Sequence, residues 1–197
     1  PLSMPTKRMD AAAPVLRTGT PAEAGLKPDT PERVRAAARA WNEATGIPFS
    51  VVVARHGIVA FHEAFGSDSG GPVTVGRKFA LASLTKTHTG LMFAQFLDQG
   101  LIGLDDPVGK YLPGFATEGP NALTLRHCLT NTSGFDGHGM HGGMMNPWLD
   151  SALAGGMAPL EPGRSYLYNG MGYDLAGKVM EIVSGKSIFR LMHENFF

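Results

Sequence analysis

The sequence FALASLTKTHTGLMFAQFLDQG, residues 79–100, decides the fold. Its centre, SLTK, places Ser83 three residues before Lys86 at the beginning of a predicted helix. Positions i and i+3 share a helix face, with Cβ atoms about 5–6 Å apart, so the lysine nitrogen can reach the serine hydroxyl. A serine needs such a neighbouring base to become a nucleophile, and unpaired N–H groups at a helix N-terminus stabilise a developing oxyanion. The same four letters also occur in ordinary surface helices, so the surrounding sequence has to decide.

On the N-terminal side, the sequence predicts one helix and one hairpin. The helix begins at Thr30, a favoured N-cap residue, and ends at Gly46. FSVVVARHG and IVAFHEAFG predict two strands joined by a turn at His56-Gly57. Two strands joined by a hairpin are marginally stable alone, so we expect a sheet with further strands.

On the C-terminal side, the pattern changes to short helices separated by glycine- and proline-rich loops. The serine helix carries an apolar stripe and ends at Gly100. LTLRHCLTNTSG predicts a short helix capped by Thr124. GYDLAGKVMEIVSG predicts a helix that ends at Gly185, and SIFRLMHENFF predicts another that begins at Ser187.

The composition indicates a globular protein and excludes several partners. Of the 197 residues, 43% are hydrophobic, which is enough for one good-sized core. Lys and Arg together number 17, as do Asp and Glu, so we expect no nucleic-acid partner. A single cysteine, Cys128, excludes an internal disulfide framework, and the absence of an apolar run of about 18 residues predicts no membrane span.

Three sequence blocks occur in a characteristic order. They are FALASLTKTHTGLMFAQFLDQGLIGLDDPVGKYLPGF, LTLRHCLTNTSGF and LEPGRSYLYNGMGYDLAGKVMEIVSGKSI. In this order and spacing they resemble the serine β-lactamase and penicillin-binding-protein family, most closely the branch of class C β-lactamases, D-alanyl-D-alanine peptidases and related esterases. The resemblance runs from about Phe49 to Phe197. It implies an α/β (α+β) fold, in which an antiparallel sheet flanked by helices and an all-helical region enclose the active site between them.

The resemblance also implies roles for individual residues. Ser83 would attack a carbonyl group and form an acyl-enzyme, while Lys86 would share and orient its proton. Tyr168 would be the phenol beside both, and would pass the proton to the leaving group. In the alternative interpretation, Tyr168 is a packed aromatic residue of the YLY cluster, where Tyr166 is easily confused with it. No cofactor is expected.

The tyrosine block departs from the family pattern at one position. The family usually has asparagine two residues after the tyrosine, and its amide helps to hold the substrate and the lysine. Here Gly170 occupies that position and Asn169 comes one residue early. We expect both residues at the substrate-binding position, with a shift of register letting Asn169 supply the amide. The departure weakens the case for β-lactam or peptide recognition more than the case for acyl transfer.

A second departure concerns the third family motif, Lys-Thr-Gly or His-x-Gly on a late strand. No such segment follows Tyr168. HTG at residues 88–90 lies inside the serine helix and HGG at residues 141–143 lies in a predicted loop, so we interpret both as coincidences. The chain therefore resembles the N-terminal half of such an enzyme, without the closing C-terminal strands. Three explanations of the missing strands stay open. The sequence is a fragment, the chain is nicked into two pieces, or a partner, a second polypeptide, completes the fold.

The predicted organisation has three parts. Residues 1–29 form an N-terminal arm, residues 30–78 form the helix and hairpin of the α/β part, and residues 79–197 form the serine helix and the all-helical region. The sheet is incomplete within the chain.

Other sequence signals are weaker. His138 and His141, with Asp136 nearby, are too few for a zinc site, which needs three or four converging ligands, so no metal is predicted. Trp148 lies in the same glycine-rich loop, where it lines a substrate entrance or simply packs the loop.

We therefore predict a serine hydrolase that acts on small ester or amide substrates, either an esterase or a β-lactamase-like enzyme. Two alternatives of another kind stay open: a non-catalytic β-lactam-binding or sensor module, and an inactive half that needs a complementary chain. The compartment is not determined by the sequence, although the resemblance favours a periplasmic or secreted protein.

Overall fold

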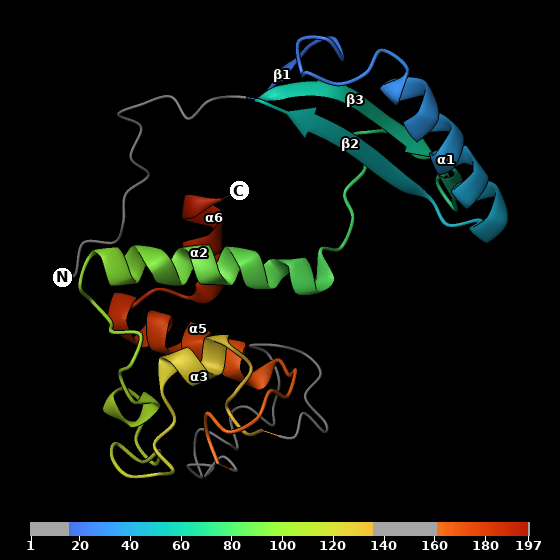
Figure 1. Cartoon of the computed structure of the whole chain (residues 1–197). Helices are drawn as coiled ribbons and strands as arrows, with labels where there is room; N and C mark the ends of the chain where they lie inside the picture. Colours follow the sequence, from blue (N-terminus) through green and yellow to red (C-terminus); the bar gives the residue numbers. More distant parts are fainter. Residues whose placement is uncertain (1–15, 136–160, 197) are drawn as a thin grey trace. The chain divides into compact units, whose positions relative to one another are not determined.

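The computed structural model describes residues 16–135 and 161–196. These residues form two compact units, with the boundary between Ala80 and Leu81. The first unit holds a helix and a small sheet, and the second is helical (Figure 1).

The sheet of the first unit has three strands in the order β1-β3-β2. Strands β2 (Phe49–Arg55) and β3 (Ile58–Phe65) are antiparallel, and β1 (Arg17–Thr18) is parallel to β3. The predicted hairpin is confirmed. Its two turn residues, His56 and Gly57, have φ values of 53° and 77°. Two consecutive positive φ values are typical of the type I′ turn, whose twist matches that of the flanking strands.

Helix α1 (Thr30–Thr45) lies along this sheet, as Figure 1 shows. Ala38 of the helix is buried with Phe61 and Phe65 of β3 in a small core. Arg35 extends the contact, because its Nε atom donates to a Glu63 carboxylate oxygen at 2.9 Å. A separate two-stranded sheet follows, formed by β4 (Ser67–Asp68) and β5 (Gly71–Pro72).

The ends of α1 agree in part with the sequence signals. The Arg33 N–H donates to the Asp29 carbonyl at 3.1 Å, so the helical hydrogen bonds begin one residue earlier than predicted and Asp29, not Thr30, is the N-cap. At the other end, Gly46 has a φ of 66° and its N–H donates to the Asn42 carbonyl at 2.7 Å. This left-handed conformation is the reason that glycine ends helices so often.

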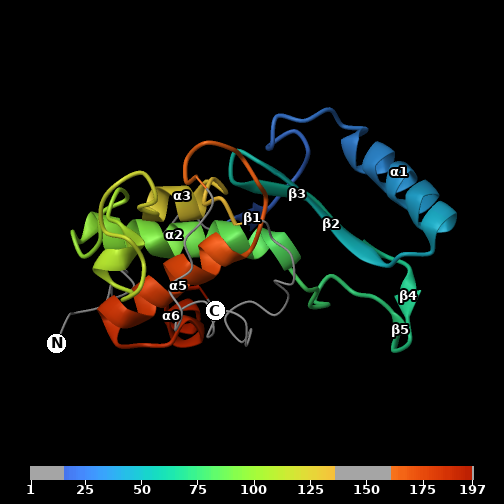
Figure 2. The same cartoon turned by 90° about the horizontal axis from the view of Figure 1, so that it is seen from below.

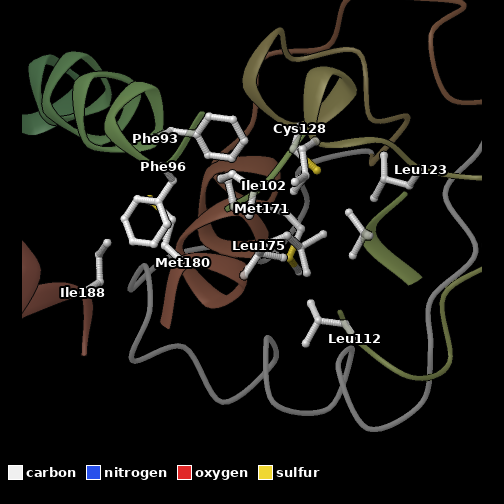
Figure 3. Close-up of a cluster of buried hydrophobic side chains, with 14 of the residues drawn as sticks. Phe93, Phe96, Ile102, Leu112, Leu123, Cys128, Met171, Leu175, Met180 and Ile188 are labelled. Atoms are coloured by element: carbon white, nitrogen blue, oxygen red, sulfur yellow. The ribbon is translucent and has the colours of Figure 1, made fainter. Parts of the chain in front are cut away.

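The second unit is built around two long helices that lie side by side, α2 (Thr85–Asp98) and α5 (Met171–Ser184) (Figures 1 and 2). Helices α3 (Leu125–Leu129) and α6 (Ile188–Asn195) pack against them. Figure 3 shows the side chains of these helices converging on one hydrophobic core. Its buried members include Met92, Phe93, Phe96, Leu123, Leu125, Cys128, Met171, Leu175, Val179, Met180, Ile188 and Leu191.

The α3–α5 contact depends on a glycine. A Cβ atom on Gly172 would lie 2.4 Å from the carbonyl oxygen of Cys128, so only glycine allows the two backbones to come this close. Helix α3 is fixed at its beginning by the predicted cap, Thr124, whose hydroxyl accepts the His127 N–H at 3.3 Å. The predicted end of α5 at Gly185 and the predicted cap of α6 at Ser187 are also confirmed.

In the connector between α2 and α3, the Asp106 carboxylate accepts several hydrogen bonds. Asp106 accepts hydrogen bonds from the Gly103 N–H at 2.7 Å, the Lys110 ammonium at 2.9 Å and the Tyr111 hydroxyl at 2.5 Å. A short 3₁₀ helix, Val108–Lys110, lies within it. In the part of the chain that the structure describes, no helix is long and apolar enough to cross a membrane.

Candidate active site

Ser83 lies at the junction where the chain enters α2. It is the middle residue of a 3₁₀ turn, Ala82–Leu84, that continues directly into the α-helix. Ala82, immediately before it, has a φ of 46°, which is the left-handed region that alanine seldom adopts. Backbone strain of this kind is concentrated at functional sites. Ser83 itself is exposed, so its hydroxyl is accessible to a ligand.

Lys86 reaches Ser83 as the i, i+3 spacing predicts. Its Nζ atom donates to the Ser83 Oγ atom at 3.3 Å. The same ammonium group lies 4.7 Å from the centre of the Tyr168 ring and 5.4 Å from the centre of the Tyr173 ring. A cation near aromatic rings is attracted by their negative faces, so the two tyrosines help to hold the lysine beside the serine.

Tyr168 completes the cluster from a distant part of the sequence. Its hydroxyl group donates a hydrogen bond to the Ser83 Oγ atom, across 85 residues. Hydrogen bonding to Lys86 lowers the pKa of the Tyr168 phenol below its usual value, and the Ser83 hydroxyl and the positive charge of Lys86 add to the effect. The phenolate form is therefore easier to reach than in a free tyrosine. Ser83, Lys86 and Tyr168 are brought together, all within the helical unit.

The segment that carries Tyr168 is held by the loop after α3. The Leu167 N–H donates to the Asn131 carbonyl at 2.8 Å, and the Asn169 N–H donates to the Asn131 side-chain oxygen at 3.3 Å. Asn131 can do both because it adopts a φ of 57°, a conformation that asparagine tolerates better than most residues. Tyr168 is thus fixed on both sides by one residue.

Asn169 points into the protein. Its side chain is buried, and its amide nitrogen lies 2.8 Å from the Leu167 carbonyl and 3.5 Å from both the Ser133 hydroxyl and the Phe135 carbonyl. Its side-chain oxygen accepts the Gly172 N–H at 3.3 Å. These contacts hold the turn between Tyr168 and α5, and they are not contacts with Ser83 or Lys86. Its role in substrate binding stays a prediction.

Gly170, the other predicted substrate-binding residue, immediately precedes α5. Among residues 16–135 and 161–196, a Cβ atom built on it would meet one neighbour within 4 Å, the Oδ2 atom of Asp174 at 4.0 Å. The family amide at this position is therefore absent, and the nearest described side chain is the Asp174 carboxylate. Burial raises the pKa of this carboxyl to about 6, and the positive charge of Lys86 opposes the rise.

Tyr173 and Asp174 are residues that the sequence did not single out. Tyr173 donates its hydroxyl proton to the Leu129 carbonyl at 2.9 Å, which fixes the ring beside Lys86. The signal for Tyr173 was present in the Gly-Tyr pair of the third block. Asp174 could have been found from its i+4 spacing to Gly170, because that spacing places both residues on one helix face.

The remaining sequence signals lie partly inside and partly outside the described residues. His88 lies within α2, as predicted. His127 caps α3, where its Nδ1 atom accepts the Thr124 N–H at 3.3 Å. The residues His138, His141, Asp136 and Trp148 lie outside the described residues. Within residues 16–135 and 161–196, no group of three or more His, Cys, Asp or Glu residues is arranged to hold a metal ion.

Comparison with known proteins identifies the family. The family model described as Beta-lactamase matches residues 29–197. Penicillin-binding protein 4* of Bacillus subtilis is 28% identical over 164 residues, which cover 75% of this chain and 35% of that protein. Monacolin J acid methylbutanoyltransferase of Aspergillus terreus is 31% identical over 156 residues, which cover 63% of this chain and 36% of that protein.

A solved structure shows the same fold. The penicillin-binding protein homologue from Caulobacter crescentus matches with a TM-score of 0.66 and 27% identity, over 86% of this chain and 48% of that one. The predicted resemblance and the predicted α/β, β-lactamase/transpeptidase-like fold class are confirmed. The chain spans between about a third and a half of the length of these proteins.

Proposed function

This chain belongs to the beta-lactamase family, and from that premise we propose that it is a serine hydrolase that forms an acyl-enzyme on Ser83. One observation carries the proposal: the Ser83 hydroxyl accepts hydrogen bonds from both the Lys86 ammonium and the Tyr168 hydroxyl. A nucleophile beside a base, with a third group that orients both, is the general arrangement of covalent catalysis.

Before acylation, Tyr168 would release its proton to solvent and become a phenolate. The phenolate then accepts the Ser83 hydroxyl proton while Oγ forms a bond to the substrate carbonyl carbon. Lys86 keeps its positive charge beside the phenolate and stabilises it. Ser83 lies at the beginning of α2, where the positive end of the helix dipole would stabilise the negative oxygen of the tetrahedral intermediate.

The intermediate would collapse by breaking the bond between the carbonyl carbon and the leaving group. The leaving group takes the proton held by Tyr168, and the acyl group stays on Ser83. A water molecule or an alcohol next gives its proton to Tyr168 and attacks the acyl carbon, and Ser83 recovers its proton as it leaves. Attack by water is hydrolysis, and attack by an alcohol is acyl transfer.

The substrate class we propose is a small ester or amide. The names of two relatives support acyl chemistry, since one is a penicillin-binding protein and the other a methylbutanoyltransferase. We favour an esterase over an efficient β-lactamase. The amide of Asn169 faces the interior and Gly170 has no side chain, so neither supplies an amide beside the serine in the conformation described.

A second candidate function is a β-lactam-binding module, in which Ser83 is acylated but the acyl group is not released. That neither Asn169 nor Gly170 places an amide beside Ser83 favours it, because acylation needs only the serine, lysine and tyrosine. In that case an acyl group from a β-lactam would persist on Ser83 for hours in an intact-mass spectrum, whereas a hydrolase would lose it within minutes. An inactive half that needs a complementary chain would not be acylated at all.

A fluorophosphonate probe tests the proposal directly. We expect the intact mass of the full chain to increase by one probe adduct, and the increase to vanish in Ser83→Ala. Ser69→Ala is the matched control, because Ser69 is exposed and lies in the other unit. Labelling that persists in Ser83→Ala, or no labelling of the unsubstituted chain, would contradict an activated serine at this position.

A further inference from the structure

The Lys86 ammonium needs a fixed position, because it lies between the Ser83 hydroxyl and the Tyr168 phenol. Its Nζ atom is 3.3 Å from the Ser83 Oγ atom, which is longer than most N–H···O hydrogen bonds. A lysine side chain has a long, flexible stem, so one long hydrogen bond to an exposed serine does not fix it. A further contact is needed to restrain the ammonium.

The Tyr173 ring supplies such a contact from a rigid element. The Lys86 ammonium lies 5.4 Å from the centre of this ring, within the roughly 6 Å range of cation–π attraction. Tyr173 is half-buried and belongs to the first turn of α5. Tyr168, whose ring also contacts Lys86, precedes α5 and is 52% exposed. Tyr173 is therefore the better fixed of the two rings.

The Tyr173 hydroxyl fixes the ring to a second helix. It donates to the Leu129 carbonyl at 2.9 Å, and Leu129 is the last residue of α3, where helical carbonyls lack partners within the helix. Gly172 lets α3 and α5 come close enough for this bond, since a Cβ atom on it would lie 2.4 Å from the Cys128 carbonyl oxygen. The packing of two helices thus sets where the Tyr173 ring lies.

The surroundings of the two tyrosines favour different charge states. Burial raises the pKa of Tyr173, the positive charge of Lys86 opposes the rise, and the nearby Tyr168 and Tyr166 add to it. Hydrogen bonding to Lys86 instead lowers the pKa of Tyr168. Asp174, the residue after Tyr173 on α5, also interacts with the charge of Lys86. Tyr173 can therefore stay a neutral phenol beside the ammonium while Tyr168 changes its charge.

We propose that Tyr173 is a positioning residue that holds the Lys86 ammonium against the Tyr168 phenol through the negative face of its ring. The inference rests on the proposed function, because it concerns the phenol that would carry the proton. Without the attraction of this ring, Lys86 has other directions open to it, and Tyr168 loses part of the hydrogen bonding and positive charge that favour its phenolate. Tyr173 acts on the reaction through Lys86 and Tyr168.

Two variants of nearly equal shape test the ring. Tyr173→Phe keeps the negative face, whereas pentafluorophenylalanine at position 173 carries fluorine atoms that withdraw electrons, so that its face no longer attracts a cation. The rate of Ser83 labelling by a fluorophosphonate is measured against pH. We expect Tyr173→Phe to keep the midpoint of the unsubstituted chain. The midpoint of the fluorinated variant should be about one pH unit higher, toward the ordinary tyrosine pKa, which lowers the rate about tenfold below both midpoints.

The same two substitutions at Tyr111 are the matched control. Tyr111 is also half-buried in the helical unit, its ring centre lies 5.2 Å from the Lys110 ammonium, and its hydroxyl donates to Asp106. This pair therefore removes a comparable contact that does not involve Lys86, and both variants should keep the midpoint. A merely structural role of Tyr173 would lower the stability or the rate at every pH without separating its two variants.

A second measurement does not depend on labelling. Ultraviolet absorbance follows the ionisation of the tyrosines during a pH titration of the full chain, and the signal that vanishes in Tyr168→Phe belongs to Tyr168. We expect this signal to appear at higher pH in the fluorinated variant at position 173 than in Tyr173→Phe.

The outcomes separate this inference from the proposed function. Equal midpoints in the two variants at position 173, or an equal separation of the two at position 111, overturn the role of Tyr173, while labelling of Ser83 still supports the hydrolase. If Ser83 is not labelled, the proposed function is overturned. The absorbance titration then decides by itself whether Tyr173 holds Lys86 against Tyr168.

Discussion

The hydroxyl groups of Ser83 and Tyr168 meet although 85 residues separate them in the sequence. The Ser83–Lys86 contact needs only a helix, because three residues of helical backbone place the two side chains on one face. The Tyr168 contact needs the whole helical unit to fold first. At the residue scale, the candidate site therefore combines one local contact with one long-range contact.

The role of the Tyr168 hydroxyl can be tested by Tyr168→Phe, which keeps the ring beside Lys86. We expect the rate of Ser83 labelling to fall about 10²–10⁴-fold, the usual contribution of a positioned acid–base group. The rate in the unsubstituted chain should rise with pH as the phenol ionises, below the usual tyrosine pKa of about 10, because hydrogen bonding to Lys86 lowers this pKa. The variant should lose that rise.

Tyr166→Phe is the control for this prediction, since Tyr166 lies two residues away in the same segment and is exposed. Its labelling rate and pH profile should match those of the unsubstituted chain. If Tyr166→Phe loses the pH-dependent rise and Tyr168→Phe keeps it, the phenol of the site has been assigned to the wrong residue.

At the scale of single elements, short-range signals predicted most boundaries. The hairpin turn at His56-Gly57, the cap of α3 at Thr124 and the end of α5 at Gly185 were all identified from the sequence. Each depends on interactions within about one turn of backbone, which is why the local sequence reveals them. Strand β1 lies in the predicted N-terminal arm and was not foreseen, because two residues are too few for a periodic pattern.

Two glycines in the long helices give a matched test of how these elements pack. Gly172→Ala should destabilise the protein by about 2–3 kcal/mol, because the added Cβ atom would lie 2.4 Å from the Cys128 carbonyl oxygen and α3 and α5 must move apart. The Cβ atom of Gly90→Ala, inside α2, meets no atom of the described residues within 4 Å, and the change should stabilise the protein by about 0.5–1 kcal/mol, since alanine is the better helix former.

Urea denaturation followed by circular dichroism measures both changes in the free energy of unfolding. The two glycines act as controls for each other, because each variant adds the same methyl group to a helix. Equal effects of the two substitutions would show that the α3–α5 approach is not tightly packed.

At the scale of the whole molecule, the two units have very different cores. The helical unit buries a large cluster of apolar side chains from all four of its described helices, whereas the core of the sheet unit consists of Ala38, Phe61 and Phe65 with partly buried neighbours. Buried apolar area is the main source of stability, so most of the free energy of folding within the described residues comes from the helical unit. That unit carries all three groups of the candidate site.

The stability of the molecule should depend on pH through Asp174. Burial raises the pKa of its carboxyl to about 6, against an ordinary value near 3.8. The folded state therefore binds this proton more tightly than the unfolded state, and the stability contributed by this group is greatest below about pH 4 and is lost as the pH rises through about 6. Asp174→Asn should remove this loss.

We expect Asp174→Asn to raise the free energy of unfolding by about 1 kcal/mol near pH 8, after allowance for partial solvent exposure. Near pH 3.5 the two proteins should differ by close to zero. Urea denaturation at a series of pH values provides the measurement. The exposed Asp98→Asn should show no such trend. A constant difference between Asp174→Asn and the unsubstituted chain at every pH would mean that burial does not penalise the ionised carboxylate.

The sequence by itself predicted Ser83 as the candidate nucleophile with Lys86 as its partner, and it determined the hairpin and most helix ends, because each depends on residues a few positions apart. The family resemblance added Tyr168 and the fold. Only the tertiary structure decided which way Asn169 points and what lies beside Gly170. Both depend on how α5 packs against the loop after α3, where the Asn169 amide finds partners in Ser133 and Phe135. Long-range packing selects among side-chain directions that the local sequence leaves equally possible. Here it turned the Asn169 amide inward and placed the Asp174 carboxylate beside Gly170.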